Sequence, residues 1–272
     1  MRVSAKKLED FKQDIWKYYN KNKRDLPWRR TTDPYLIVVS EVMLQQTQVA
    51  RVVQKFNEFT RVFPTFKTLA LASKSDVLRL WQGMGYNRRA LYLKALAGII
   101  EKEYKGRLPD SPKVLIRLPS IGHATAGSIV AFAYNKPTVF IETNIRRVFI
   151  HFFFKNGTGI DDKEILLLVE KTLDKRRPRE WYWALMDYGS MLAKILPNPN
   201  RNSKHYVIQK PFQGSNRQLR GAILKLILKQ GGLSKKALSD SLPGSNSKLA
   251  AILNSLVKEG FLVKNAQTYQ VQ

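Results

Sequence analysis

The chain of 272 residues contains no cysteine. This absence excludes a disulfide scaffold, thiolate zinc sites, cysteine nucleophiles and cysteine-ligated iron–sulfur clusters. Histidine is also scarce: the chain has three copies, at positions 123, 151 and 205, and none belongs to an HExxH-type pair. A metal site built from histidine is therefore not expected.

Long apolar stretches are missing too. No run of about 18 apolar residues occurs, so we expect no transmembrane helix. Residues 1–19 mix charged and apolar side chains and lack the apolar segment of a signal peptide. We expect an intracellular protein that is cytoplasmic, and associated with the nucleoid if the source is prokaryotic.

Acidic residues are few, with 21 against 47 basic residues, which gives a formal net charge of +26. A field of this sign favours a polyanionic partner. Nucleic acid is the first interpretation, and an anionic membrane surface is the alternative. The hydrophobic fraction of 44% is sufficient for a packed core, and the length of 272 residues is compatible with one large domain or with about two to three small ones.

Before residue 210 the sequence pattern predicts helices almost throughout. Asp33-Pro34 is typical of a helix start, the apolar spacing from Val49 to Phe59 is helical, and another helix is expected over residues 87–102. Residues 195–216 are rich in proline and asparagine, which indicates an ordered crossing segment or a linker.

Residues 213–272 show a different pattern. Helices are predicted over residues 217–229, 234–242 and 245–259, and residues 261–271 are typical of a β-hairpin. This order indicates a winged helix-turn-helix. Its candidate DNA-binding residues are Lys235, Lys236 and Lys248. A small helical protein-interaction domain is the alternative.

Residues 118–126, Leu-Pro-Ser-Ile-Gly-His-Ala-Thr-Ala, join two helical segments. In a helix–hairpin–helix, the backbone N–H groups of such a turn and of the following helix N-terminus bind a DNA phosphate without reading the base sequence. A plain turn between two helices is the alternative at this point.

Two glutamates stand out in apolar surroundings. Glu41 lies inside an apolar helical run, where burial would raise its pKa into the range that a general acid needs at neutral pH. Glu142 follows an apolar run and precedes a helix, so it could stabilise positive charge on a sugar while an N-glycosidic bond breaks. The alternatives are an exposed Glu41 on an amphipathic helix and a Glu142 that only caps its helix.

Several ordered motifs between residues 24 and 191 carry a resemblance. They are Leu26-Pro27-Trp28-Arg29, Pro34-Tyr35, Ser40–Val49, Leu80–Tyr86, Leu118–Ala126, Glu142-Thr143-Asn144 and Met186-Asp187-Tyr188-Gly189. On these motifs the chain resembles the helix–hairpin–helix (HhH-GPD) DNA glycosylase superfamily, and within it the adenine DNA glycosylases.

This resemblance implies an all-α fold with a two-lobed helix–hairpin–helix core. One lobe would comprise residues 1–30 and 135–212. The other would be a six-helix lobe of residues 31–134, with the helix–hairpin–helix at about 113–131. Residues 213–272 would add the winged-helix-like domain.

The resemblance also implies roles for single residues. Glu41 matches the general acid and base, Glu142 matches a catalytic carboxylate that is Asp in the family, and Asn144 matches the residue that orients that carboxylate. Gln46 and Tyr86 match residues that wedge into the DNA stack when a base flips out. The base pocket would comprise Trp28, Arg29, Asp187 and Ala124. The hairpin would bind DNA through Leu118, Ser120, Ile121, Gly122, His123 and Thr125.

The sequence differs from the family in three features that affect the expected activity and cofactor. Position 124 is alanine, where bifunctional relatives carry a Schiff-base lysine and adenine glycosylases often carry Ser or Tyr. The positions of the cysteines that hold a four-iron cluster in many relatives are Ala193, Asn200, Ser203 and Gln209, so no cluster is expected and packing alone would hold the 195–212 segment. A winged helix stands where classical adenine glycosylases have a nudix-like domain. The hairpin could hold a monovalent cation.

We therefore expect a monofunctional DNA glycosylase of base excision repair that leaves an abasic site, with no lyase activity. Its partner would be double-stranded DNA with a mismatched or damaged base, it would act as a monomer, and it would not bind a membrane. Adenine is the first candidate for the excised base. Mismatched thymine or uracil, or a deaminated purine such as hypoxanthine, are the alternatives. A catalytically inactive DNA-binding protein is the alternative of another class.

Overall fold

The computed structural model describes residues 3–155, 157–209, 211–242 and 246–272. The described chain is mostly helical and carries one small sheet. Its contacts divide it into two compact units: Met1–Glu41 with Pro109–Ile208, and Val42–Leu108 with Gln209–Gln272. None of the described helices is both long and apolar enough to cross a membrane.

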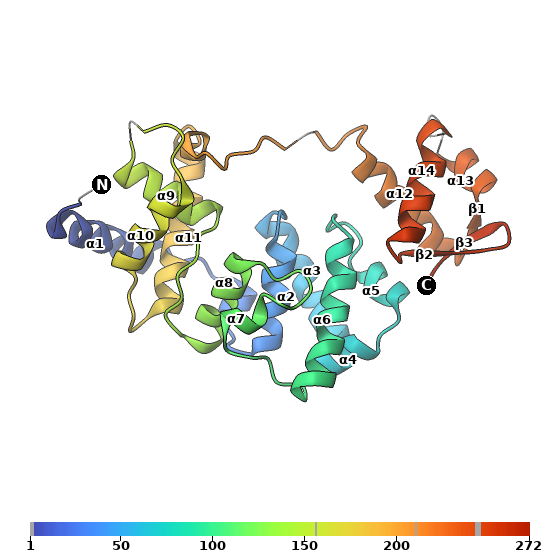
Figure 1. Cartoon of the computed structure of the whole chain (residues 1–272), viewed down its shortest axis with the longest axis horizontal. Coiled ribbons are helices and arrows are strands. Elements are labelled where there is room, and N and C mark those ends of the chain that lie inside the picture. Colours follow the sequence, from blue (N-terminus) through green and yellow to red (C-terminus); the bar gives the residue numbers. More distant parts are fainter. Residues whose placement is uncertain (1–2, 156, 210, 243–245) are drawn as a thin grey trace. The chain divides into compact units, whose positions relative to one another are not determined.

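The first unit is built on two long helices, α1 (Ala5–Asn22) and α11 (Pro178–Ile195), with α9 (Thr143–Phe153) packed against α11 (Figure 1). The remaining elements of this unit are η1 (Pro27–Arg29), α2 (Pro34–Leu44), which runs into the second unit, α7 (Pro112–Leu115), α8 (His123–Tyr134), α10 (Asp162–Thr172) and η2 (Pro199–Asn202). Aromatic side chains fill the core, where the Phe11 ring lies 5.2 Å from that of Phe149 and 6.0 Å from that of Trp181.

Gly189 explains why α9 and α11 can lie so close together. A Cβ atom at this position would come within 2.5 Å of the Asn144 carbonyl oxygen and 2.7 Å of the Asn144 Cβ. The absence of a side chain at Gly189 therefore lets the start of α9 rest directly on α11. This contact places Asn144, one of the predicted site residues.

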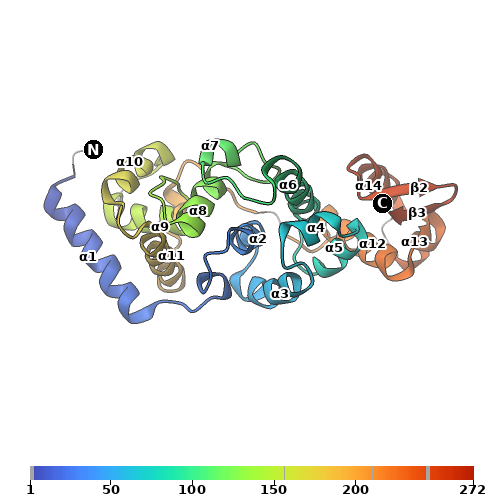
Figure 2. The ribbon, with the colours of Figure 1, turned by 90° about the horizontal axis from the view of Figure 1, so that it is seen from below.

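The second unit contains α3 (Val49–Val62), α4 (Phe66–Leu71), α5 (Lys74–Leu80) and α6 (Arg88–Tyr104), followed by the C-terminal elements. These are α12 (Asn216–Gln230), β1 (Leu233–Ser234), α13 (Lys235–Ser241), α14 (Asn246–Lys258), β2 (Leu262–Asn265) and β3 (Thr268–Val271). The strands form an antiparallel sheet in the order β1-β3-β2, and β2 and β3 lie side by side in Figure 2.

This order of helices and strands is that of a winged helix, as predicted, although the short strand β1 was not expected. Ser245, with which the third helix was predicted to begin, lies outside the described residues. The winged helix packs against the preceding part of its own unit, where α12 contacts α5. The contact includes an ion pair between Arg88 Nη2 and Glu259 Oε2 at 2.5 Å and a hydrogen bond from Lys74 Nζ to the Gly260 carbonyl at 3.3 Å.

The two units divide the chain at points other than the predicted lobe boundaries. Residues 109–134, predicted to belong to the six-helix lobe, cluster with α11. The reason is visible at Arg179, which donates hydrogen bonds from α11 to the carbonyl oxygens of Phe132 at 2.5 Å and Ala133 at 3.0 Å. The lobes themselves stay a prediction.

Candidate active site

Glu41 lies on α2 and is itself partly exposed, but the neighbouring residues of this helix are buried. Ile37, Val38 and Val39 are each at most 1% exposed. Burial raises the pKa of the Glu41 carboxyl from its ordinary value of 4.5 to about 7. A hydrogen bond from Ser128 and the positive charge of Arg29 oppose this rise in pKa, whereas the negative charge of Glu142 adds to it. The expectation of a general acid with a raised pKa is thus supported by its surroundings, and the exposed-stripe alternative is wrong.

Glu142 is the N-cap of α9, and its side chain is only partly exposed. Its Oε1 accepts hydrogen bonds from the backbone N–H groups of Asn144 at 2.8 Å and Ile145 at 3.0 Å. Burial raises the pKa of Glu142, and these two hydrogen bonds and the charges of two nearby arginines oppose the rise. The capping and catalytic interpretations are compatible, because capping fixes the carboxylate close enough for its charge to act on Glu41.

Asn144 joins Glu142 to a buried arginine. Its Nδ2 donates to Glu142 Oε2 at 3.3 Å, and its Oδ1 accepts from Arg147 Nη1 at 2.7 Å. The same Arg147 nitrogen donates to the Gly189 carbonyl at 2.8 Å. Arg147 thereby sets which side of the Asn144 amide faces Glu142, and this supports the predicted orienting role. Sequence reasoning missed Arg147, because an arginine within a charged helical run carries no local signal of burial.

The base-pocket candidates on the first unit centre on Asp187, which is 2% exposed. Its carboxylate accepts two hydrogen bonds from Arg29, both at 2.8 Å, and two from Arg24, at 3.0 Å from the backbone nitrogen and 2.5 Å from Nε. Because these bonds occupy both carboxylate oxygens, any effect of Asp187 on a base would pass through Arg29. Trp28, which precedes Arg29 in η1, is buried at 5% exposure, and Arg24 was not predicted.

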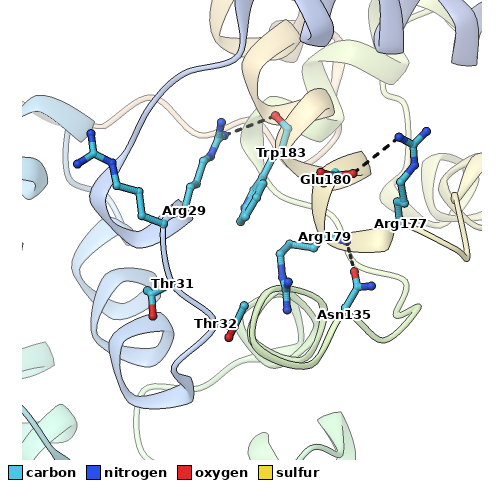
Figure 3. A pocket seen from close by; sticks show the side chains of 9 residues that line it. Arg29, Thr31, Thr32, Asn135, Arg177, Arg179, Glu180 and Trp183 are labelled. Carbon is cyan, nitrogen blue, oxygen red and sulfur yellow. Dashed lines mark hydrogen bonds and ion pairs between the residues drawn. The ribbon is translucent and has the colours of Figure 1, made fainter.

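Arg29 also lines a pocket of about 470 Å³ (Figure 3). Four of its lining residues are basic, namely Arg29, Arg30, Arg177 and Arg179. Neither Glu41 nor Glu142 lines it. Its arginines already have partners: Arg29 binds Asp187, Arg30 pairs with Asp25, Arg179 binds the last turn of α8, and Arg177 lies 3.8 Å from Glu180. The pocket is therefore separate from the carboxylate site, and much of its positive charge is compensated.

The predicted hairpin lies between α7 and α8, as expected for a helix–hairpin–helix. Ser120 adopts φ of +66°, the left-handed conformation for which the family uses glycine. Leu118 and Ile121 are buried at 5% and 6% exposure, so their side chains anchor the hairpin, and only their backbone could meet DNA. α8 begins at His123 directly after Gly122, which has no side chain to cap the helix, as suits an anion site at the helix N-terminus.

Gln46 and Tyr86, the predicted wedge residues, belong to the second unit. Both have positive φ, 53° and 47°, a conformation that is rare outside glycine and recurs at functional sites. Arg217 Nη1 donates to the Tyr86 hydroxyl at 2.6 Å, and Gln209 Nε2 bonds the same hydroxyl and lies 3.5 Å from Gln46 Oε1. Gln209 thus contacts both wedge residues and Arg217 contacts Tyr86, which the sequence did not indicate.

Arg89, another residue that was not predicted, fixes the loop that carries Gln46. It is 7% exposed, and its Nη1 donates to the carbonyl oxygens of Val42 at 2.8 Å and Met43 at 3.0 Å, while Nη2 donates to Thr47 Oγ1 at 2.9 Å. These bonds satisfy the C-terminal carbonyls of α2 and hold the turn that follows.

The three predicted DNA-binding lysines of the winged helix are exposed. Lys235 and Lys236 lie in the first turn of α13, and Lys248 lies on α14. They are therefore available to a phosphate backbone.

Within the 195–212 segment, residues 200–204 are held by hydrogen bonds, so the expectation of packing alone is wrong for this part. Asn200 is 4% exposed and donates from Nδ2 to the Thr143 carbonyl at 3.1 Å. The Ile160 backbone pairs with Asn202 and Lys204, each at 2.9 Å. The donor set at the cysteine positions of the family is alanine, two amides and a hydroxyl, which offers no thiolate and does not fit an iron–sulfur cluster. Among the described residues no group of three or more His, Asp or Glu side chains could hold a metal ion.

Comparison with known proteins agrees with this fold. The family described as "HhH-GPD superfamily base excision DNA repair protein" matches residues 39–175, and the chain belongs to this superfamily. The adenine DNA glycosylase of Buchnera aphidicola subsp. Baizongia pistaciae is 34% identical over 207 residues, which cover 72% of this chain and 58% of that protein. The chain spans about half the length of the adenine DNA glycosylases it matches.

Two further similar proteins are named as thymine glycosylases rather than adenine glycosylases. The thymine/uracil-DNA glycosylase of Methanothermobacter thermautotrophicus is 28% identical over 194 residues, which cover 70% of this chain and 88% of that protein. A solved structure of a thermostable thymine-DNA glycosylase superposes with a TM-score of 0.62 at 26% identity, covering 69% of this chain and 88% of that one. The mostly helical prediction and the superfamily assignment are thus confirmed.

Proposed function

We propose that this protein is a monofunctional DNA glycosylase that removes one base from double-stranded DNA and leaves an abasic site. The observation that carries this proposal is the pair of carboxylates on the first unit: Glu41, with a pKa of about 7, and Glu142, fixed by the N-terminus of α9. Near neutral pH such a pair supplies one proton donor and one negative charge, the two groups that hydrolysis of an N-glycosidic bond requires.

In the proposed reaction the protonated Glu41 gives its proton to the flipped base as the bond between the base and the sugar C1′ breaks. The bonding electrons leave with the base, and positive charge develops on the sugar, where the Glu142 carboxylate stabilises it. Water then adds to C1′ and gives its proton to Glu41. The cycle returns Glu41 to its acid form and needs neither a metal nor an iron–sulfur cluster.

Position 124 supports hydrolysis without strand cleavage. A lyase needs an amine that attacks the sugar, and alanine cannot supply one. Borohydride should therefore trap no covalent complex between the wild-type protein and DNA, and strand breaks should appear only after alkali. Efficient trapping by the unmodified chain would contradict the monofunctional assignment.

Double-stranded DNA is the partner that the charge and the surface features support. The formal net charge of +26, the helix–hairpin–helix and the exposed lysines of the winged helix all favour contacts to phosphate. The positive φ at Gln46 and Tyr86 supports a wedge that occupies the space of a flipped nucleotide.

Adenine is the first candidate for the excised base, because relatives named adenine DNA glycosylase share 34% and 42% of their aligned residues with this chain. Thymine or uracil is the second, because the relative named thymine/uracil-DNA glycosylase matches over 88% of its own length.

The test is single-turnover excision on a set of duplexes, each with one candidate pair: adenine opposite 8-oxoguanine or guanine, thymine or uracil opposite guanine, and hypoxanthine opposite thymine. Alkali then reveals abasic sites. Glu41→Gln is the control: it should abolish excision while DNA binding persists, since an amide cannot cycle a proton. Excision of none of these bases by the wild type would favour a DNA-binding protein without catalysis, and near wild-type excision by Glu41→Gln would refute the site.

A further inference from the structure

Ser128 lies on α8 in the first unit, and its side chain is directed at Glu41. Its Oγ is 2.5 Å from Glu41 Oε2 and 3.0 Å from the carbonyl oxygen of Thr125, and the residue is 3% exposed. The neighbours of Ser128 on α8, from Ala126 to Ala133, are otherwise apolar and buried. A hydroxyl in such surroundings is costly unless it is hydrogen-bonded, so its two oxygen partners account for its burial.

A serine hydroxyl has one hydrogen to donate and lone pairs with which to accept. When Glu41 is ionised, Ser128 donates its hydrogen to the carboxylate. When Glu41 is protonated, the carboxyl O–H donates to Ser128 Oγ, and the serine hydrogen turns to the Thr125 carbonyl. The same two heavy atoms, Ser128 Oγ and Glu41 Oε2, therefore stay hydrogen-bonded in both protonation states.

We propose that Ser128 is a positioning residue that holds the Glu41 carboxyl in one orientation while Glu41 gives up its proton and takes one back. This inference rests on the proposed function, because the proton cycle is that of base excision. Ser128 lies one helical turn after Ala124, and residues four apart share one face of a helix. The hydroxyl on this face of α8 thus comes from position 128 in this chain, whereas adenine glycosylases often carry one at the position of Ala124.

Other groups near Glu41 act on it in a different way. Glu142 at the start of α9 and Arg29 in η1 change the stability of its charged form through their own charges. Ser128 in addition forms a directed hydrogen bond, which orients the carboxyl as well as stabilising its ionised form. Loss of the hydroxyl should therefore change two quantities together: the rate of excision and the pH at which Glu41 titrates.

The experiment measures single-turnover excision against pH for the wild type, Ser128→Ala and Ser128→Thr. In Ser128→Ala the rate constant at the optimum should fall about tenfold, in line with the loss of one hydrogen bond to a charged group, while substrate binding is unchanged. The alkaline limb of the profile should move to higher pH, because the ionised form of Glu41 loses a donor. Ser128→Thr keeps the hydroxyl and should recover most of the rate and the original limb.

Ser40→Ala is the matched control, because Ser40 is also buried and its Oγ also donates to a backbone carbonyl, that of Ile37 at 2.9 Å. This variant should keep the wild-type limb. A rate loss in Ser128→Ala with an unmoved limb, a profile identical to wild type, or an equal shift in Ser40→Ala would each overturn the proposal. So would a Ser128→Thr protein that is folded but behaves like Ser128→Ala.

A measurement without DNA separates this inference from the proposed function. In protein labelled with ¹³C at the glutamate carboxyl carbon, the Glu41 signal is assigned by its loss in Glu41→Gln and then titrated. Ser128→Ala should raise the pKa of Glu41. If the wild type excises no base but this rise occurs, the proposed function fails and the contact stands. If excision occurs without the rise, the inference about Ser128 fails alone.

Discussion

Replacing Glu41 by glutamine should stabilise the folded protein at alkaline pH while it removes the proton that excision requires. Burial raises the pKa of Glu41 from 4.5 to about 7, so the folded protein retains a proton that the unfolded chain releases. Glutamine has the shape of the protonated acid, can accept the hydrogen bond of Ser128 and never ionises.

The sign of the effect follows from proton binding. Between the unfolded pKa of 4.5 and the folded value of about 7 the folded state binds more protons, so the free energy of unfolding of the wild type falls as the pH rises through this range. At about 1.4 kcal/mol for each pH unit, the full fall amounts to about 3 kcal/mol. Relative to the wild type, Glu41→Gln should gain nothing near pH 4.5 and up to about 3 kcal/mol by about pH 8.

Urea unfolding of both proteins between about pH 5 and pH 8 measures this difference directly. Glu103→Gln, which removes a carboxylate at an exposed position of α6, is the control for the same change of side chain outside the site. A stability difference between Glu41→Gln and the wild type that is constant over this range would show that Glu41 titrates near its ordinary value. The general acid would then have to be another residue.

Three further predictions concern the supports of the site and the contacts to DNA. Gly189→Ala should destabilise the fold by about 1–3 kcal/mol in urea unfolding and slow excision, because the new Cβ would overlap Asn144 and push α9 off α11; a variant as stable as the wild type would contradict this contact. Arg217→Ala should reduce base flipping, followed by 2-aminopurine fluorescence in the duplex, because Arg217 holds the Tyr86 hydroxyl, whereas Lys225→Ala on the exposed face of the same helix should not. The third variant replaces three exposed lysines of the winged helix by alanine, at Lys235, Lys236 and Lys248. The slope of the logarithm of the DNA-binding constant against the logarithm of the salt concentration should become shallower by about 3. An unchanged slope would mean that the winged helix does not touch DNA.

Helix starts near the site were predictable because each depends on a few neighbouring residues. The Tyr35 N–H binds the Asp33 side chain at 2.8 Å at the start of α2, as the Asp-Pro pair indicated, and Glu142 caps α9 through the backbone that follows it. The strand β1 was not predictable in this way. It has two residues and exists through its pairing with β3, where Leu233 lies opposite Tyr269.

The sequence by itself determined which residues could do chemistry. It placed one glutamate within an apolar helix and another before a helix start, put alanine at the lyase position, and left the chain without cysteine. Only the tertiary structure decided what those residues touch. Ser128 meets Glu41 across 87 residues of chain, and Arg217 meets Tyr86 across 131. Local patterns reflect interactions within a turn or two, whereas these contacts depend on how whole helices pack, and the pKa of Glu41 follows from that packing.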